Sequence, residues 1–312
     1  MNILVTGGTG FIGQALIRDL LTKQHTITLI TRHVHKAKSF FNQNHLSKLT
    51  FIQLEQLTKV DEFDAIINLA GEPIIGKRWS NKQKNQICQS RWHITLALTQ
   101  LIKQSQTPPS VFISASAIGF YGVHGDELLD ETRDITTNLN DDFGHYICKK
   151  WEQLALEAQS DNTRVCILRI GIVLGKNGGA LSKMLLPFKL GLGGHIADGK
   201  QGMSWVHLQD LIGLIDFVMT NTDCSGIYNG TAPNPVSNNV FSKTLANSLN
   251  RPCLFPVPEF VLKLVMGESA ILLTKGQFVT PKRALNQGFY FKYSQLDEAL
   301  KEIVNAQQAQ ND

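Results

Sequence analysis

The chain has 312 residues, of which 43% are hydrophobic and 18% charged, and its formal net charge is +4. This length and composition allow a large buried core and argue against disorder. The basic residues are scattered, so we expect neither a nucleic-acid partner nor attraction to an anionic membrane, and no segment reaches the roughly 18 apolar residues needed to span a bilayer.

The five cysteines are odd in number, widely spaced and never arranged as C-x-x-C. This pattern favours reduced thiols in the core over disulfides, and it predicts no metal site. The first residues, "MNILVTGG", lack a basic region followed by a long apolar stretch and a cleavage site. A cytoplasmic protein is therefore expected.

The first half of the chain alternates short β-branched runs with amphipathic segments. Residues 2–7 predict a strand, residues 8–13 a glycine-rich turn and residues 14–23 a helix, and residues 25–32 predict a second strand. Later segments continue the alternation, with strands predicted at 64–71, 110–116 and 164–175 and helices at 81–104 and 145–159. Such alternation predicts an α/β fold, a Rossmann-type doubly wound parallel sheet covered on both faces.

The amino-acid composition changes at about residue 175, because residues 175–202 are rich in glycine. We therefore expect residues 1–175 to form a nucleotide-binding domain and residues 176–312 a smaller, mixed subdomain on the substrate side. The segment near 207–220 has helical patterning and is expected to return to the first domain. A small C-terminal module is predicted at about 255–302.

The glycine turn "TGGTGFIG" lies between the first predicted strand and the first predicted helix. Gly7, Gly10 and Gly13 would let the backbone turn tightly and approach a pyrophosphate, and the amide groups of Phe11 and Ile12 at the start of the helix would donate to it. This context predicts dinucleotide binding, with a purely structural turn as the alternative.

The second predicted strand ends at Arg32, followed by His33 and Lys36. Enzymes that prefer NAD usually carry an acidic residue near this point for the ribose 2′-hydroxyl, whereas an arginine accommodates a 2′-phosphate. The sequence therefore favours NADP(H) as the cofactor, with NAD(H) as the alternative. A solvated basic loop would explain the same residues without a ligand.

Several further motifs occur along the chain in a fixed order: "INLAGEPI", "FISASAIGFYG", "YICKK", "RIGIVLG" and "WVHLQDL". Together with the glycine turn, they resemble the extended short-chain dehydrogenase/reductase superfamily, the NAD(P)-dependent epimerases and dehydratases. The segments "NLAGEPIIGKRW" and "GQFVTPKRALNQGFYFKY" resemble more narrowly a bacterial branch called epimerase-family proteins, which has a small C-terminal domain of unassigned role.

The resemblance implies that the turn after the fourth strand lines the ribose side of the cofactor, with Leu69, Ala70 and Gly71 in contact with it. It also implies a serine near the end of the fifth strand. "SASA" offers Ser114 and Ser116. We favour Ser116 as the catalytic residue, because the alanine after it matches the serine-alanine step of the superfamily, and assign Ser114 to the cofactor side.

Tyr146 and Lys150 are four residues apart and so share one face of a helix. A tyrosine with a pKa of about 10 is a poor base in water, and a nearby ammonium group lowers that pKa. The resemblance implies that Tyr146 exchanges the proton while Lys150 tunes it and holds the nicotinamide ribose. An ordinary helix-surface pair is the alternative interpretation.

Glu72, Arg78 and Trp205 are further candidates for substrate contacts, and Arg91 could frame the substrate mouth. Arg169 could meet an anionic substrate, although surface or structural ion pairing is the simpler interpretation. The favoured hypothesis is an NADP(H)-dependent oxidoreductase or epimerase that transfers a hydride at a carbinol or carbonyl carbon of a small molecule, with a sugar nucleotide suggested by the resemblance. The alternative is a non-catalytic NADPH-binding regulator or scaffold, and a homodimer is left open.

Overall fold

The computed structural model describes residues 1–135, 139, 142–176 and 178–308. Its centre is a seven-stranded sheet in the order β11-β7-β5-β4-β1-β2-β3, and each of its strand pairs is parallel. The strands are β1 (Asn2–Thr6), β2 (Thr26–Ile30), β3 (Leu49–Ile52), β4 (Ala65–Asn68), β5 (Val111–Ala117), β7 (Arg164–Ile170) and β11 (Gly226–Gly230). The predicted α/β Rossmann-type fold is confirmed.

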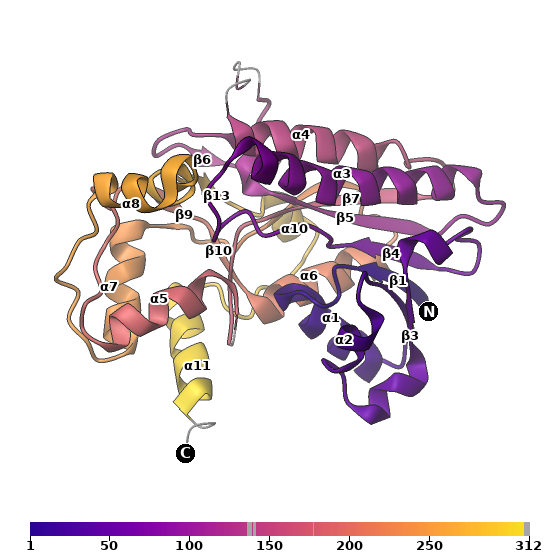
Figure 1. Cartoon of the computed structure of the whole chain (residues 1–312), viewed down its shortest axis with the longest axis horizontal. Coiled ribbons are helices and arrows are strands. Elements are labelled where there is room, and N and C mark those ends of the chain that lie inside the picture. The colour runs from indigo at the N-terminus through magenta and orange to yellow at the C-terminus, as the bar shows by residue number, and fades with distance from the viewer. Residues whose placement is uncertain (136–138, 140–141, 177, 309–312) are drawn as a thin grey trace.

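Helices cover both faces of this sheet (Figure 1). α3 (Asn81–Gln104) and α4 (Phe143–Leu156) lie side by side on one face, and α1 (Phe11–Thr22) packs with α6 (Leu208–Thr220) on the other. All four residues of β4 are buried. Burial on both faces explains why these strands read as continuous apolar runs and not as alternating patterns.

The sheet order reverses between β1 and β4, which are neighbours although β2 and β3 intervene in the sequence. In open parallel sheets of this type, the crevice at the carboxyl ends of the strands beside the reversal is the usual place for a ligand. The turns that follow β1, β4 and β5 all meet at this edge.

A second lobe is built mainly from the C-terminal part of the chain and lies to the left in Figure 1. Its core is enclosed by α5 (Gly179–Lys189), α7 (Asn238–Ser248) and α11 (Leu296–Gln308), with Trp205 among its buried residues. The remaining elements are η1 (Gln43–Lys48), η2 (Leu54–Gln56), η3 (Ile118–Tyr121), η4 (Gly267–Ala270), α2 (Val34–Lys38), α8 (Glu259–Met266), α9 (Ile271–Thr274), α10 (Lys282–Asn286), β6 (Leu128–Leu129), β8 (Ile172–Leu174), β9 (Gly202–Met203), β10 (Trp205–His207), β12 (Val236–Ser237) and β13 (Phe278–Val279).

The chain crosses between the lobes more than once. After β8 and α5 it returns through α6 and β11 to the first lobe, and β11 becomes the edge strand beside β7. His207 caps α6, because its Nδ1 accepts from the amide of Gln209 at 3.2 Å, and the Asp210 carboxylate accepts from the amides of Lys292 and Tyr293 at 2.8 and 2.9 Å. These bonds fix the segment that leads into α11.

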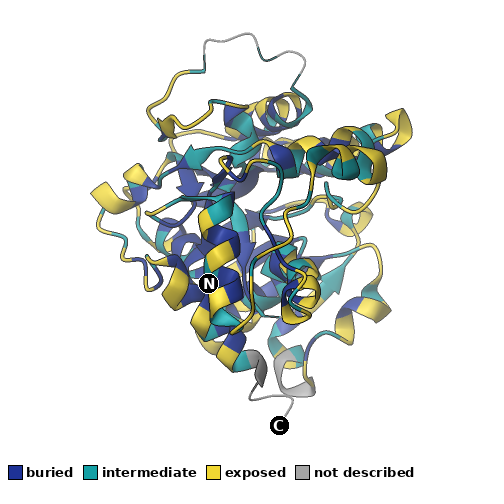
Figure 2. Cartoon of the chain, turned by 90° about the vertical axis from the view of Figure 1, so that its left-hand side faces the viewer, coloured by how far each residue is buried: buried dark blue, intermediate teal, exposed yellow. Residues whose placement is uncertain are grey.

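Figure 2 shows buried residues concentrated in the strands and on the inner faces of the helices. All five cysteines are unpaired, and four of them are buried. Among the described residues, we find neither a helix long and apolar enough to cross a membrane nor a cluster of side chains suited to hold a metal ion.

Candidate functional site

The turn between β1 and α1 depends on two glycines that no other residue could replace without a backbone shift. Gly7 has a φ of +70°, and a Cβ there would lie 2.4 Å from the carbonyl oxygen of Leu69. A Cβ at Gly13 would lie 2.3 Å from the carbonyl oxygen of Gly7. The turn after β4 and the first turn of α1 therefore both press against the Gly7 backbone.

The third glycine of the turn, Gly10, is the N-cap of α1 and is exposed. It supplies no capping side chain, and the first turn of the helix holds no acidic residue. The amide groups at the start of a helix lack partners within the helix and favour an anion. The geometry therefore leaves a place for a phosphate at this end of α1.

The Phe11 ring packs against the glycines at the start of α5. Cβ atoms built on Gly178 and Gly179 would lie 2.2 and 3.0 Å from its ring, and one on Gly175 would also lie 3.0 Å away. The glycines that lead into α5 and begin it therefore make room for the ring, and Phe11 links the nucleotide-side turn to the second lobe. Only its backbone amide remains for the predicted cofactor contact, in the same helical turn as Ile12.

Arg32 lies two residues after the end of β2 and is exposed. It makes no ion pair with any described residue. The residues from Thr31 to Lys36 include no carboxylate. The end of β2 is thus positively charged and open, as the sequence interpretation requires.

The turn after β4 is ordered by a buried hydrogen-bond network centred on Asn68. Thr6 donates to Asn68 Oδ1 at 2.6 Å, and Asn68 Nδ2 donates to Thr95 Oγ1 at 2.8 Å. The indole of Trp151 also donates to Thr95 Oγ1, at 2.9 Å. This network joins β1, β4, α3 and α4, and it sets the position of Leu69, which touches the glycine turn.

Leu69 and Ala70 are partly buried and Gly71 is exposed, so this turn opens toward solvent within three residues. Ser114, by contrast, is fully buried inside β5, where its hydroxyl lies 3.4 Å from Asn68 Nδ2. Its described contacts belong to the network under the turn and are not directed into an open crevice.

Ser116 belongs to a buried cluster formed by three elements. Its hydroxyl donates to Glu152 Oε1 at 2.6 Å, and Arg169 donates to the two oxygens of Glu152 from Nε and Nη2, at 2.9 and 2.8 Å. Their exposed fractions are 3%, 4% and 2% for Ser116, Glu152 and Arg169. The Ser116 hydroxyl therefore donates its proton to a carboxylate in a charge-assisted hydrogen bond. The ion pair of Arg169 with Glu152 confirms the ion-pairing interpretation of this arginine.

Tyr146 and Lys150 lie on a different side of α4 from the one that faces Ser116. The Tyr146 ring is 51% exposed and packs edge-on against Trp92 of α3, with ring centroids 5.5 Å apart. The ammonium of Lys150 lies 4.3 Å from the centre of the same indole ring. The structure brings Tyr146 and Lys150 together, but it does not bring either of them to Ser116.

The face of α4 that does meet β5 and η3 carries Gly144, Cys148 and Glu152. A Cβ on Gly119 would lie 3.7 Å from Gly144 Cα, which marks the close approach of helix and η3. Positions two residues apart differ by about 200° around a helix, so this face is nearly opposite to that of Tyr146. Burial, and next the Glu152 carboxylate, raise the pKa of the Cys148 thiol to about 11, against a lowering by the Ser116 hydroxyl.

The three residues predicted to contact the substrate lie in three different environments. The indole of Trp205 is fully buried in the core of the second lobe and donates to the carbonyl of Asn234 at 3.1 Å, so a direct substrate contact by Trp205 is wrong for this structure. Arg78 donates to the carbonyls of Leu264 and Val265, where it caps the C-terminal end of α8. Glu72 pairs with Lys77 at 2.9 Å near the exposed turn after β4.

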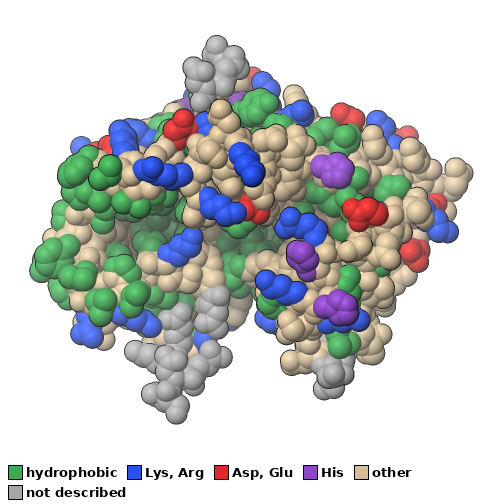
Figure 3. Space-filling model, viewed as in Figure 1, with side chains coloured by type: hydrophobic (Ala, Val, Ile, Leu, Met, Phe, Trp, Pro, Cys, Tyr) green, Lys and Arg blue, Asp and Glu red, His purple; other side chains and the backbone are tan. Residues whose placement is uncertain are grey.

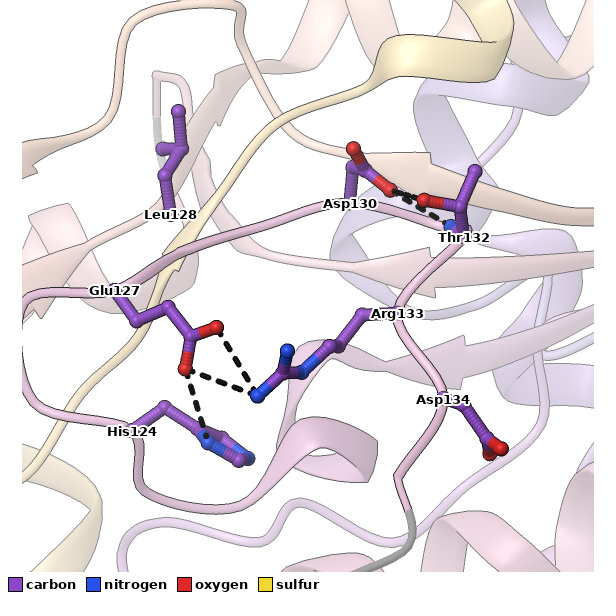
Figure 4. Close-up of a pocket in the computed structure, with 7 residues that line it drawn as sticks. All are labelled: His124, Glu127, Leu128, Asp130, Thr132, Arg133 and Asp134. Carbon is purple, nitrogen blue, oxygen red and sulfur yellow. Dashed lines mark hydrogen bonds and ion pairs between the residues drawn. The ribbon is translucent and has the colours of Figure 1, made fainter.

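The surface is hollowed between the two lobes (Figure 3), with hydrophobic side chains deep inside and Lys and Arg side chains around the opening. A second hollow of about 480 Å³ lies elsewhere, beside β6, and Figure 4 shows its polar lining. There Glu127 pairs with Arg133 and faces His124, while Asp130 accepts from Thr132. Because these side chains neutralise one another, the hollow between the lobes is the better candidate.

Sequence reasoning missed Glu152 as a partner of Ser116 and Cys148 as its neighbour. The sequence contains a signal for this second pair, because Cys148 and Glu152 are four residues apart, like Tyr146 and Lys150. The sequence predicts Arg91 at the rim of the substrate site. It lies beneath Gly71, where a Cβ would meet its guanidinium carbon at 2.9 Å.

Comparisons with known proteins agree with this architecture. A protein from Bacillus subtilis, epimerase family protein YfhF, is 36% identical over 311 residues, which cover 97% of this chain and 98% of that protein. The chloroplastic epimerase family protein SDR39U1 homolog of Arabidopsis thaliana is 39% identical over 307 residues, which cover 97% of this chain and 87% of that protein. The crystal structure of human epimerase family protein SDR39U1 (isoform 2) with NADPH has a TM-score of 0.88 at 33% identity, over 98% of this chain and 99% of the human one.

Two family profiles divide the sequence between them. Residues 257–303 match a domain of unknown function, DUF1731. Residues 3–229 match the NAD dependent epimerase/dehydratase family, and this region contains the glycine turn, the Asn68 network and the Ser116 cluster. The chain therefore belongs to the NAD dependent epimerase/dehydratase family.

Proposed function

We propose that this protein binds NADP(H) in the crevice beside β1 and β4 and uses it in oxidoreductase or epimerase chemistry on a small molecule. The observation that carries the proposal is the β1–α1 turn, in which Gly7 and Gly13 permit backbone contacts that a Cβ would block. The human relative of known structure was crystallised with NADPH. When bound, the nicotinamide ring supplies a hydride or accepts one.

The residues present fit such a cofactor. The amide groups of residues 11–13 would hold the pyrophosphate, since Gly10 leaves the helix end uncapped and exposed. Leu69 and Ala70 would line the ribose side, because their turn touches Gly7. Arg32 would meet a 2′-phosphate, since it is exposed at the end of β2 and has no acidic partner among the described residues.

The substrate would lie in the hollow between the lobes, next to the end of β5. Hydride transfer requires a carbinol or carbonyl carbon held in near-contact with the cofactor, so the apolar interior of the hollow supports the reaction by excluding water. A sugar nucleotide is one substrate class that the family suggests. The family resemblance predicts proton transfer by Tyr146, but the described contacts of its ring are with Trp92, and we propose a reaction that does not depend on it.

A second candidate is an NADP(H)-binding protein without turnover. It is favoured by one observation: the Ser116 hydroxyl donates to Glu152 and is not free to orient a substrate oxygen. The two candidates share the cofactor and differ in chemistry. A screen of carbonyl compounds and nucleotide sugars separates them if it follows both NADPH oxidation and isomerisation of the sugar, because an epimerase consumes no cofactor overall. Either change supports the enzyme, and the complete absence of both supports the binder.

Cofactor binding itself is tested best at Gly10. Its φ of −78° and ψ of 174° suit an N-cap residue with a side chain, and a Cβ there meets one neighbouring atom, Gly7 O, at 3.2 Å. Gly10→Asp and Gly10→Asn would both cap α1 and preserve the fold, but only the aspartate places a negative charge where the phosphates would lie.

In a fluorescence titration with NADPH, we expect the Asp variant to bind at least about tenfold more weakly than the Asn variant, because like charges would meet in the crevice. Gly213→Ala in α6 is the control, since its Cβ would make ordinary contacts at 3.5 Å with Phe289. Equal NADPH affinity of wild type and the Asp variant would refute the assignment of the turn.

A further inference from the structure

Arg91 is a half-buried cation between the turn after β4 and helix α4. Its Nη1 donates to the carbonyls of Glu72 and Ile87, both at 3.0 Å, and its guanidinium carbon lies 5.2 Å from the ring centre of Trp151. Gly71 has no side chain, which leaves room for the guanidinium beneath the turn. Four contacts thus hold this side chain in one orientation.

The other edge of the guanidinium, formed by Nε and Nη2, has no hydrogen-bond acceptor among the described residues. Both atoms reach solvent, since neither is among the buried side-chain atoms that lack a partner. Within the described chain, Arg91 also has no carboxylate at ion-pair distance, because the nearby Glu72 pairs with Lys77.

In Arg169, the corresponding edge of the guanidinium binds a carboxylate. It uses the same two atoms, Nε and Nη2, to bind both oxygens of Glu152 at 2.9 and 2.8 Å. A planar guanidinium with these two donors matches the geometry of a carboxylate. Arg91 presents an equivalent edge, held in place and open, without the carboxylate.

The position of Arg91 places this edge at the candidate site. Gly71, against its guanidinium, belongs to the turn whose Leu69 carbonyl touches Gly7. The ring centre of Trp151 of α4 lies 5.2 Å from the guanidinium carbon, and the next residue of that helix, Glu152, accepts from Ser116 at the end of β5. Burial lowers the pKa of Arg91, and the Cys148 thiol of α4 opposes this most strongly. A ligand on Arg91 would therefore lie between the glycine turn and the end of β5.

We propose that Arg91 is the binding site for a carboxylate group of the substrate, so that the substrates of this protein are carboxylic acids. This inference rests on the proposed function, because it places the acid beside NADP(H). Arg91 would hold the carboxylate through its two open donors and thereby orient the rest of the molecule toward the hollow between the lobes. It is a binding residue and takes no part in proton or hydride transfer.

Benzoate and benzamide are suitable probes, because they have nearly the same shape and differ in charge. Each is titrated by isothermal calorimetry into wild type, Arg91→Gln, Arg91→Lys and the control Arg251→Gln, an arginine that donates to the carbonyl of Lys189 in the second lobe, with NADPH at saturation and again without it. We expect wild type and the control to bind benzoate at least about tenfold more tightly than benzamide. The Gln variant should lose this preference, and the Lys variant, which keeps the charge but lacks the two parallel donors, should lose most of it.

Several results would overturn the inference. These are equal affinity of wild type for the two probes, no benzoate binding at all, or a benzoate preference that survives in Arg91→Gln. Unchanged benzamide affinity in the variants shows that the hollow is intact. If the Arg91 variants bind NADPH more weakly than wild type, the arginine serves the cofactor instead and the substrate role falls. If wild type binds benzoate but not NADPH, the proposed function fails while the carboxylate site stands.

Discussion

The buried pair of Glu152 and Arg169 should control the stability of the region around Ser116. Glu152→Gln removes the negative charge with almost no change in shape and leaves the Arg169 guanidinium, whose side chain is 3% exposed, without a counter-charge. Breaking a buried pair in this way costs about 3–5 kcal/mol, because the remaining ion is neither solvated nor paired. We expect a loss of this size in the free energy of unfolding.

The assay is urea unfolding followed by circular dichroism, with two companions for the Gln variant. Glu157→Gln is the matched control at the end of the same helix, since its pair with Lys103 spans 3.7 Å and both side chains are more than half exposed. It should change stability by less than about 1 kcal/mol. The double variant Glu152→Gln/Arg169→Met removes both buried charges and should recover part of the loss.

The reasoning would be refuted if Glu152→Gln unfolded within about 1 kcal/mol of wild type, like the exposed control. It would also be refuted if the double variant were less stable than the Gln variant by the full cost of a second independent mutation. Either result would mean that the charges in the Ser116 cluster are solvated or paired differently from the geometry described above.

Three further expectations concern the cofactor and the α4 helix. Arg32→Ala should weaken NADPH binding and leave NADH binding nearly unchanged in parallel titrations, because it removes the cation at the end of β2; an equal loss for both cofactors would contradict a contact with the 2′-phosphate. Tyr146→Phe should leave NADPH affinity and any turnover unchanged, since the Tyr146 ring packs against Trp92 on a different side of α4 from Glu152, the partner of Ser116. Loss of turnover with intact NADPH binding would restore the tyrosine to proton transfer. The pKa of the Cys148 thiol is raised from 9.0 to about 11 in the folded protein. Between these two pH values the folded protein retains a proton that the unfolded chain releases, so the free energy of unfolding should fall as the pH rises from 9 toward 11. Cys148→Ala should lose that part of the slope in unfolding experiments at successive pH values, and equal slopes would contradict the burial of this thiol.

The fold and the glycine turn could be predicted from the sequence because both depend on residues close together in the chain. Residues 2–13 contain an apolar strand, three glycines and the start of a helix, and each step has a local cause in backbone conformation. The alternation of strands and helices then restricts the topology to parallel crossovers of one hand. These inferences required no knowledge of which distant residues meet.

The Ser116 cluster could not be predicted in this way, because its members come from β5, α4 and β7. A four-residue spacing identifies residues on one side of a helix but does not say which side meets the sheet. In α4, both the Tyr146–Lys150 pair and the Cys148–Glu152 pair satisfy the spacing. The family resemblance favoured the first pair for the site, and the packing of the helix presents the second.

The sequence alone therefore determined the sheet, the dinucleotide-type turn and the basic end of β2, since each follows from local conformation and residue type. The tertiary structure decided the rotation of α4, the burial of Trp205 and the open edge of Arg91. The physical reason is that side chains from separate elements compete for the same interior, and the outcome depends on which indole rings and ion pairs fill it together. Trp151 and Glu152 are buried at adjacent positions of α4, and their burial turns Tyr146 toward solvent.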